Sequence, residues 1–219
     1  MGSQETDSIK AQGKKTETMV TISDQQKQQA SAWFHQLRDE IVTSFQQLEN
    51  DHADGSMAER PAGKFEVTTT QRQSDDGSDA GGGLMSVLRG GRVFEKVGVN
   101  VSTVYGRLGD QAQAAMRARP GLSDIADDPR FWASGISLVA HMQNPHCPAV
   151  HLNTRMFWTP KALWFGGGSD LNPCIEYAED TAHFHTTQKA RLDPHDPALY
   201  PKLKAWADED FYVPHRKRA

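Results

Sequence analysis

The chain has 219 residues, of which 37% are hydrophobic and 24% charged, a composition that suits one sizeable soluble domain. Its formal net charge of -4 gives no general reason to expect nucleic-acid binding. No apolar stretch is long enough to span a membrane, and the N-terminus lacks the apolar block of a signal peptide. With two cysteines, Cys147 and Cys174, outside any metal-ligand spacing, these features predict a cytoplasmic protein with free thiols.

The N-terminal part divides into a tail and a helix. Residues 1–22 are polar and show no periodicity, so we expect a disordered tail followed by a single domain over 23–219. Between Asp24 and Asn50, apolar residues recur at steps of three and four, which is the pattern of one helical face. Ser23 or Asp24 can cap the start, so the sequence predicts an amphipathic helix here.

Strand-like segments follow this helix. The expected strands are 64–71, 84–88, 92–95, 97–105, 135–141, 149–158 and 162–165. Gly90 and Gly91 form a plausible turn between two of them, whereas residues 74–83 are expected to be a mobile connection. The triple glycine Gly166–Gly168 is expected to break the last strand.

Three further segments have helical character. They are 110–117, 178–192 and 198–212, the last two being separated by prolines. A helix, a run of antiparallel strands and two more helices together predict an α+β fold.

One expected strand presents a row of polar side chains. His151, Asn153 and Arg155 are spaced two apart, so they project from the same face of the strand. The row offers a titratable proton carrier, an amide and a permanent cation, and an arginine fork is well suited to bind a carboxylate or phosphate. The alternative is a solvent-facing side of an antiparallel sheet, which needs no function.

The segment WFGGGSDLNP is a second candidate. Its glycines, including Gly167 and Gly168, would let a ligand approach the main chain, and Asp170 could accept hydrogen bonds from that ligand. It lacks the pattern of a phosphate-binding loop. A simple glycine-rich turn is the alternative interpretation.

The histidines are candidate metal ligands by type, although their local spacing is unfavourable. In a helix, His183 and His185 would point about 200° apart and could not both chelate one ion. Four histidines could converge only through the fold: His141, His151, His185 and His215. Because unligated histidines are commoner, this reasoning favours ordinary polar roles.

At these residues the chain resembles the oxygen-dependent coproporphyrinogen III oxidase family. The matching pieces are GGGLMSVLRGGRVFEKVGVNVSTVYG (81–106), GISLVAHMQNPHCPAVHLNTRMF (135–157), WFGGGSDLNP (164–173) and EDTAHFH (179–185), with a looser match over 200–216. Their order and spacing are specific, and together they cover most of the chain from residue 24 onward.

The resemblance implies a large flattened antiparallel sheet, flanked on both faces by α-helices, in a homodimer. It implies an oxidoreductase of haem and porphyrin biosynthesis that decarboxylates two propionates of coproporphyrinogen III to vinyls. The product is protoporphyrinogen IX, molecular oxygen is the electron acceptor, and carbon dioxide and hydrogen peroxide are released. The implied reaction requires no cofactor.

Site residues follow from the resemblance position by position. Ser137 falls where the family contacts substrate, His151 at the proposed proton donor, and Asn153 and Arg155 in the substrate-binding strand. Asp170 matches the aspartate that follows the glycines, which with Gly167 and Gly168 form part of the expected binding surface. The four histidines named above, His141, His151, His185 and His215, fall where some descriptions of the family place a divalent metal.

The chemistry of the substrate suits these residue types. Coproporphyrinogen carries four propionates, for which Arg155 is an apt anchor. Its four pyrrole N–H groups could donate to Asp170, which could also stabilise positive charge as electrons leave for oxygen. His151 could handle protons in that step.

The chain departs from the family pattern after His215–Arg216, where family members continue into a glycine-rich segment and further helices. We therefore expect this chain to lack the family's C-terminal segment, which supplies a further arginine, part of the pocket wall and some dimer surface. Asn172 also stands where threonine is usual. Two alternatives remain: a catalytically incomplete tetrapyrrole-binding or dimerising fragment, and a metal-dependent oxidase that uses the histidines.

Overall fold

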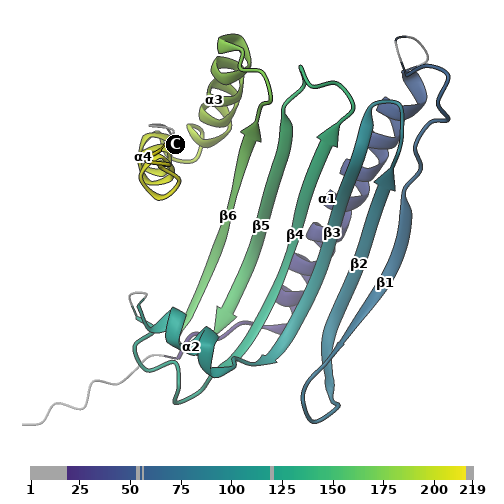
Figure 1. Cartoon of the computed structure of the whole chain (residues 1–219). Helices are drawn as coiled ribbons and strands as arrows, with labels where there is room; N and C mark the ends of the chain where they lie inside the picture. Colours follow the sequence, from purple (N-terminus) through teal and green to yellow (C-terminus); the bar gives the residue numbers. More distant parts are fainter. Residues whose placement is uncertain (1–18, 53–54, 56, 119–120, 216–219) are drawn as a thin grey trace, which may run out of the picture.

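The computed structural model describes residues 19–52, 55, 57–118 and 121–215, and these form one sheet with helices around it (Figure 1). The elements are α1 (Asp24–Asp51), β1 (Glu66–Gln73), β2 (Asp79–Arg89), β3 (Phe94–Arg107), α2 (Asp110–Arg117), β4 (Arg130–Met142), β5 (Ala149–Thr159), β6 (Ala162–Asn172), α3 (Ala178–Leu192) and α4 (Leu199–Asp210). The predicted α+β class, with its helix, strands and later helices in that order, is confirmed.

The six strands form an antiparallel meander in the order β1-β2-β3-β4-β5-β6. Strands adjacent in sequence are therefore adjacent in space, which is the usual outcome of short connections. The β5–β6 pairing runs without a register shift from Ala149 opposite Asn172 to Thr159 opposite Ala162. This regularity makes the position of each β5 side chain relative to β6 simple to derive.

The expected mobile connection at 74–83 is wrong. Ser74 to Ser78 form a hydrogen-bonded turn, in which the Ser74 N–H donates to the Ser78 carbonyl at 2.9 Å, and β2 begins at Asp79. The glycines at 81–83 show no side-chain alternation, yet their backbone pairs with β3. Likewise the two strands expected at 92–95 and 97–105 are parts of the single strand β3.

The turn between β2 and β3 is confirmed at Gly90 and Gly91. The N–H of Gly90 donates to Glu95 O and that of Gly91 to Phe94 O, both at 2.9 Å. Gly90 has a φ of 63°, a left-handed conformation that glycine adopts without steric cost. A Cβ on Gly91 would lie 2.2 Å from Glu49 Oε1, so the close approach of that carboxylate requires glycine there.

Helix α1 forms as the sequence predicts. Ser23 caps it in a capping box with Gln26, whose backbone N–H donates to Ser23 Oγ at 3.2 Å. Its apolar face packs across β3 and β4. Phe34 of the helix is buried in a core with Leu88, Phe94, Val97, Val99, Val101, Trp132, Ile136, Leu138, Ala140 and Met156.

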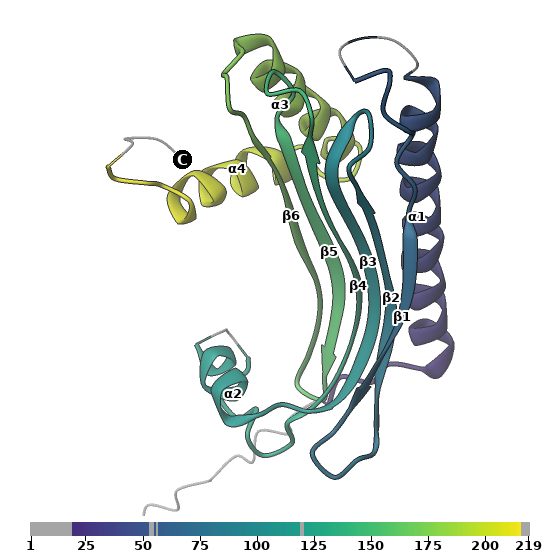
Figure 2. The same cartoon turned by 45° about the vertical axis from the view of Figure 1, so that its right-hand side comes forward.

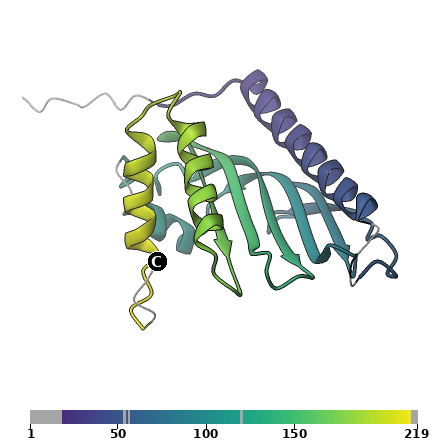
Figure 3. The same cartoon turned by 90° about the horizontal axis from the view of Figure 1, so that it is seen from above.

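The two faces of the sheet are covered very differently. Helix α1 lies along one face, and on the other side α2 stands at one end of the sheet while α3 and α4 stand at the other (Figure 2). Seen from above, α3 and α4 lie beyond the β6 edge, across the sheet from α1 (Figure 3). The expected helices on both sides are thus present, but within the described residues no helix crosses the middle of the second face. We call this second face the open face; it is turned towards the reader in Figure 1.

A buried carboxylate joins the end of α1 to the β2–β3 hairpin. The side chain of Glu49 accepts backbone hydrogen bonds from Gly63, Arg92, Val93 and Phe94 at 2.8 to 3.0 Å and is fully buried. Burial by itself raises the pKa of Glu49, but the four backbone donors outweigh it and hold that pKa below its ordinary value of 4.5.

A Glu49→Gln variant is expected to lose about 2 kcal/mol of unfolding free energy at neutral pH, because an amide cannot accept from all four donors. Because the native pKa of Glu49 is lowered, its stabilisation is present above pH 4.5 and is lost as pH falls through the native pKa. The difference between the two proteins should therefore shrink on acidification. Urea unfolding at several pH values measures this, with exposed Glu40→Gln of the same helix as control. An equal cost at every pH would contradict the assignment.

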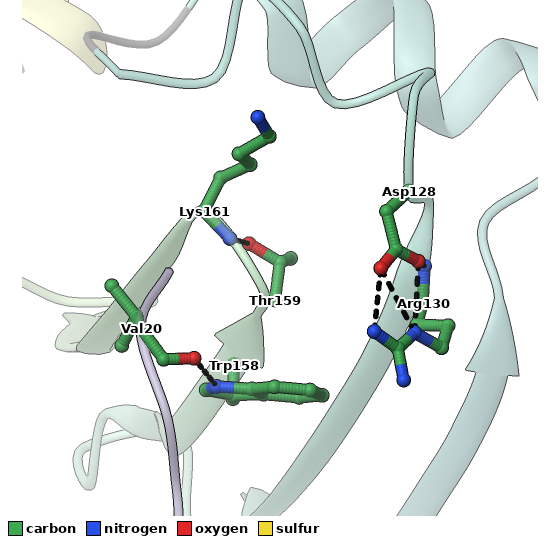
Figure 4. A network of polar contacts seen from close by, with 6 residues as sticks. All are labelled: Val20, Asp128, Arg130, Trp158, Thr159 and Lys161. Atoms are coloured by element: carbon green, nitrogen blue, oxygen red, sulfur yellow. Dashed lines mark hydrogen bonds and ion pairs between the residues drawn. The ribbon is translucent and has the colours of Figure 1, made fainter. Parts of the chain in front are cut away.

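The segment before α1 is held against the β5–β6 hairpin (Figure 4). The N–H of Val20 donates to Pro160 O at 2.9 Å, and the Trp158 indole N–H donates to Val20 O at 3.0 Å. Thr159 Oγ1 in turn accepts from the backbone of Lys161 at 3.2 Å and closes the hairpin. The predicted tail thus extends too far at its C-terminal end, since Val20 is hydrogen-bonded to the hairpin and Ile22 packs against the core. Residues 1–18 lie outside the described part of the chain.

Candidate active site

Neighbouring residues on β4 and β5 project from opposite faces of the sheet. Ile136, Leu138 and Met156 are buried in the core against α1. Residues one position away therefore project from the open face, and strand residues that face each other in the register share a face. Ser137 of β4 is one such residue, and it is exposed.

The same argument places the other predicted site residues. Asn153 faces Ser137 across the β4–β5 pair, and His151 faces Asp170 across the β5–β6 pair. Arg155, two residues beyond Asn153, shares their face. The structure thus brings together, on one side of three adjacent strands, all the catalytic residues predicted from the sequence.

Hydrogen bonds link five of these side chains into what we call the polar row: Arg155, Asn153, His151, Asp170 and Asn172. Arg155 Nη1 donates to Asn153 Oδ1 at 3.2 Å, and Asn153 Nδ2 lies 3.4 Å from His151 Nε2. His151 Nδ1 lies 2.7 Å from Asp170 Oδ1, and Asn172 Nδ2 donates to Asp170 Oδ2.

The polar row defines the tautomer of its histidine. Because a carboxylate only accepts, His151 Nδ1 carries the proton that is donated to Asp170. In the neutral ring, Nε2 then accepts from the Asn153 amide, whose oxygen in turn accepts from Arg155. Each donor therefore meets an acceptor along the whole row, and His151 is held in one orientation.

The central pair of the row is open to a ligand. The side chains of His151 and Asp170 are 37% and 50% exposed. An ion pair this exposed contributes little to stability, because solvent screens it. The pairing is better understood as orientation of reactive groups than as a structural contact.

Small residues surround Arg155 on the open face. It faces Gly135 on β4 and Gly166 on β6, so no side chain flanks it directly across either strand. A Cβ on Gly135 would lie 2.6 Å from Arg155 Cβ and 2.6 Å from Thr154 O, so glycine is required for this close approach. A Cβ on Gly166 would lie 3.7 Å from the Trp164 ring, so Arg155 has glycine backbone on both sides and an indole near Gly166.

The triple glycine does not break the strand as predicted. β6 runs from Ala162 to Asn172 through Gly166, Gly167 and Gly168, and none of the three has a positive φ. Gly168 faces Asn153 on the open face, whereas Gly167 faces Thr154 on the α1 side. The two glycines predicted to bind substrate together therefore lie on opposite faces, and only Gly168 belongs to the surface of the polar row.

Sequence reasoning missed two residues of the site. Asn172 was noted only as a departure from a family pattern, yet it donates to Asp170. Asn100 of β3 faces Ser137 and is exposed on the open face. The alternation within β3 predicts that Asn100 projects from the face away from the buried valines. Only the strand register shows that Asn100 lies two strands from Asn153 on that same face.

The four candidate metal histidines are not brought together. His151 belongs to the polar row, His141 lies on β4, and His185 on α3 stacks edge-on to Tyr200 with ring centroids 6.3 Å apart. In the part of the chain that the structure describes, His215 included, no three His, Cys, Asp or Glu side chains lie close enough to hold one ion. The residues present do not fit a single four-histidine centre.

The lengths and composition of the described helices show whether any of them could span a membrane. None of them is both long and apolar enough to cross a bilayer.

Comparison with known proteins identifies the family. The sequence model of the family described as coproporphyrinogen III oxidase matches residues 29–219. An oxygen-dependent coproporphyrinogen-III oxidase of Rickettsia bellii (strain RML369-C) is 44% identical over 187 residues, which are 85% of this chain and 62% of that protein. Proteins of the same name from Rickettsia peacockii (strain Rustic) and Rickettsia akari (strain Hartford) are each 42% identical over 191 residues. Those matches cover 87% of this chain and 63% of each relative, so the chain spans less than two thirds of their length. The match over most of the chain shows that it belongs to the coproporphyrinogen III oxidase family.

Proposed function

We propose that this chain carries the substrate-binding sheet of an oxygen-dependent coproporphyrinogen III oxidase. The observation that supports this most directly is the polar row, which sets a cation, a histidine and a carboxylate side by side on the open face of the sheet. The names of relatives at 42–44% identity support the same reaction. In this proposal the chain acts in porphyrin biosynthesis.

The proposed reaction oxidises and decarboxylates two propionate side chains. At each one, the Cα–carboxylate bond breaks, carbon dioxide leaves, one hydrogen is lost from the β-carbon, and a vinyl group forms. Two electrons and two protons pass to one oxygen molecule, which becomes hydrogen peroxide. Two such steps convert coproporphyrinogen III to protoporphyrinogen IX.

Arg155 is proposed to bind a substrate propionate. Its planar fork can form two parallel hydrogen bonds to a carboxylate, which gives orientation as well as affinity. Gly135 and Gly166 leave room beside it, so the macrocycle can lie close to the sheet. Ser137 and Asn100, which face each other on the same surface, can contact other parts of the ring.

Asp170 is proposed to lie under the macrocycle and accept its pyrrole N–H groups. A carboxylate there also stabilises the positive charge that develops as electrons leave the ring for oxygen. His151 donates to Asp170 through Nδ1, which leaves Nε2 free to exchange a proton once substrate displaces the Asn153 amide. Asn172 holds the second oxygen of the carboxylate in place.

The electron-rich substrate supplies the electrons and oxygen accepts them, so we assign no cofactor or metal to the reaction. We further propose a cytoplasmic homodimer. The free thiols of Cys147 and Cys174 support a reducing compartment, and the exposed apolar side chains of Phe165, Trp206 and Phe211 support burial against a second copy. Sedimentation equilibrium tests the dimer, and a mass of one 24.3 kDa chain would contradict it.

Oxygen uptake by the purified chain tests the proposed function. With freshly reduced coproporphyrinogen III and excess chelator, we expect one oxygen molecule consumed and one carbon dioxide released per propionate, with protoporphyrin formed after oxidation. Heat-denatured chain is the control for spontaneous oxidation of the porphyrinogen. Uptake no faster than in that control, with and without chelator, would contradict catalysis by this chain. Uptake only without chelator would instead support a metal-dependent oxidase.

A further inference from the structure

The two cysteines lie in the segments that leave the same end of β5 and β6. Cys147 is two residues before β5 begins, and Cys174 is two residues after β6 ends. The last assigned pair is Ala149 opposite Asn172, and each cysteine lies two residues beyond that pair. Both cysteines are free and exposed.

Two prolines end the strand pairing next to the cysteines. Pro148 and Pro173 lie between the last strand pair and the cysteines, and neither has an N–H to continue the ladder. The ladder therefore ends there, and the backbone bends at both cysteines; the Cys147 N–H closes a turn by donating to Asn144 O at 3.0 Å. Cys147 thus lies where the β4–β5 turn enters β5, and Cys174 lies where the chain leaves β6.

A separate contact shows that the two segments lie against each other. His146 Nδ1 is 2.5 Å from the Tyr177 hydroxyl, and the two rings are 5.9 Å apart. His146 directly precedes Cys147, and Tyr177 follows Cys174 by three residues. Figures 1 and 2 show both connections at the same end of the sheet, near the start of α3.

We propose that Cys147 and Cys174 form a reversible cross-strand disulfide when the chain meets a peroxide. Facing residues of an antiparallel pair have Cα atoms about 4.5 to 5.5 Å apart. A disulfide spans Cα separations of about 4.4 to 6.8 Å. The bridge therefore needs only a small local adjustment of the two segments.

The chemistry is a two-electron oxidation by hydrogen peroxide. One cysteine thiolate attacks a peroxide oxygen, the O–O bond breaks, water leaves and the sulfur becomes a sulfenic acid. The second thiolate then attacks that sulfur, the S–O bond breaks, a second water leaves and the S–S bond forms. Two thiols lose two protons and two electrons in total, and one peroxide becomes two waters.

The disulfide would lie close to one end of the polar row. Both cysteines lie at the end of the sheet where the polar row ends, two residues beyond Ala149 and Asn172. The bridge would join the β4–β5 connection to the segment that leads into α3. If the proposed function is right, the site itself releases hydrogen peroxide close to the cysteines. Formation of the disulfide does not depend on that function, because added peroxide can also oxidise the two thiols.

Mass spectrometry of the peroxide-treated chain tests the proposal. The reduced 219-residue protein is exposed to hydrogen peroxide, its remaining thiols are blocked with N-ethylmaleimide, and the intact mass is measured without reductant. We expect a monomeric chain lighter by two hydrogens and without blocked thiols, a tryptic peptide pair that joins Cys147 to Cys174, and full reversal by dithiothreitol.

A register-shifted variant is the matched control. Cys174→Ser combined with Ile175→Cys moves the second thiol one residue further from the last strand pair, and bridging should slow at least about tenfold. Four outcomes would overturn the proposal: two blocked thiols after peroxide, two sulfinic acids, a bridge found only between chains on a non-reducing gel, or equal bridging in the shifted variant.

Discussion

An Asp170→Ala variant is expected to form protoporphyrinogen IX at least about 100-fold more slowly than the unmodified chain. Alanine removes the carboxylate that we propose beneath the pyrrole nitrogens, and it also removes the acceptor that orients His151. Both losses act on the reacting state more than on substrate binding, so kcat should fall further than KM rises. Oxygen uptake and product fluorescence, measured over a range of substrate concentrations, give both constants.

Two further variants distinguish the effect of the Asp170 charge from the effect of its size and from a general loss of stability. Asp170→Asn retains size and an acceptor oxygen but removes the charge, so a loss close to that of alanine would assign the effect to the carboxylate charge. Asp128→Asn is the control, because Asp128 is another carboxylate hydrogen-bonded to a neighbour, Arg130, outside the polar row. Since the Asp170 side chain is half exposed, none of these changes should lower the Tm appreciably. Near-normal turnover in Asp170→Ala would refute the assigned role.

An Arg155→Ala variant is expected to bind substrate about 10- to 100-fold more weakly, because a charge-assisted pair with a propionate contributes about 1.5 to 3 kcal/mol. Arg155→Lys keeps the charge without the fork and should give an intermediate loss. Fluorescence quenching on binding of coproporphyrin, the stable oxidised form of the substrate, measures the Kd directly. The same titration with a coproporphyrin tetramethyl ester, which lacks free carboxylates, should bind weakly and show no difference between the variants.

The control for Arg155 is Arg72→Ala on the exposed edge strand β1, which removes a cation without touching the polar row. A larger loss in Arg72→Ala than in Arg155→Ala would locate the propionate site elsewhere on the sheet. Equal binding of free acid and ester by the unmodified chain would show that no propionate is recognised. In either case the proposed place of the macrocycle on the open face would be wrong.

Local patterns in the sequence predicted most of the secondary structure. The bounds of α2 and α3 are those expected, and α1 and β5 each differ by a single residue at one end. These elements have clear side-chain periodicity, which depends only on nearby residues. The β2 and β6 strands were predicted too short for the same reason: their glycines carry no side chains to alternate, and pairing with β3 and β5 defines them instead.

The sequence by itself determined which side chains of β5 share a face, because alternation within one strand sets that. It could not determine what lies across from them. The contact between His151 and Asp170 joins residues 19 apart, and it depends on the β5–β6 register continuing through three glycines. The burial of Glu49 under a hairpin more than 40 residues away, and the lack of a common centre for the four histidines, likewise depend on tertiary packing. Periodicity is a short-range property of the chain, whereas register and packing arise from contacts between distant segments, so only the tertiary structure decided the form of the site.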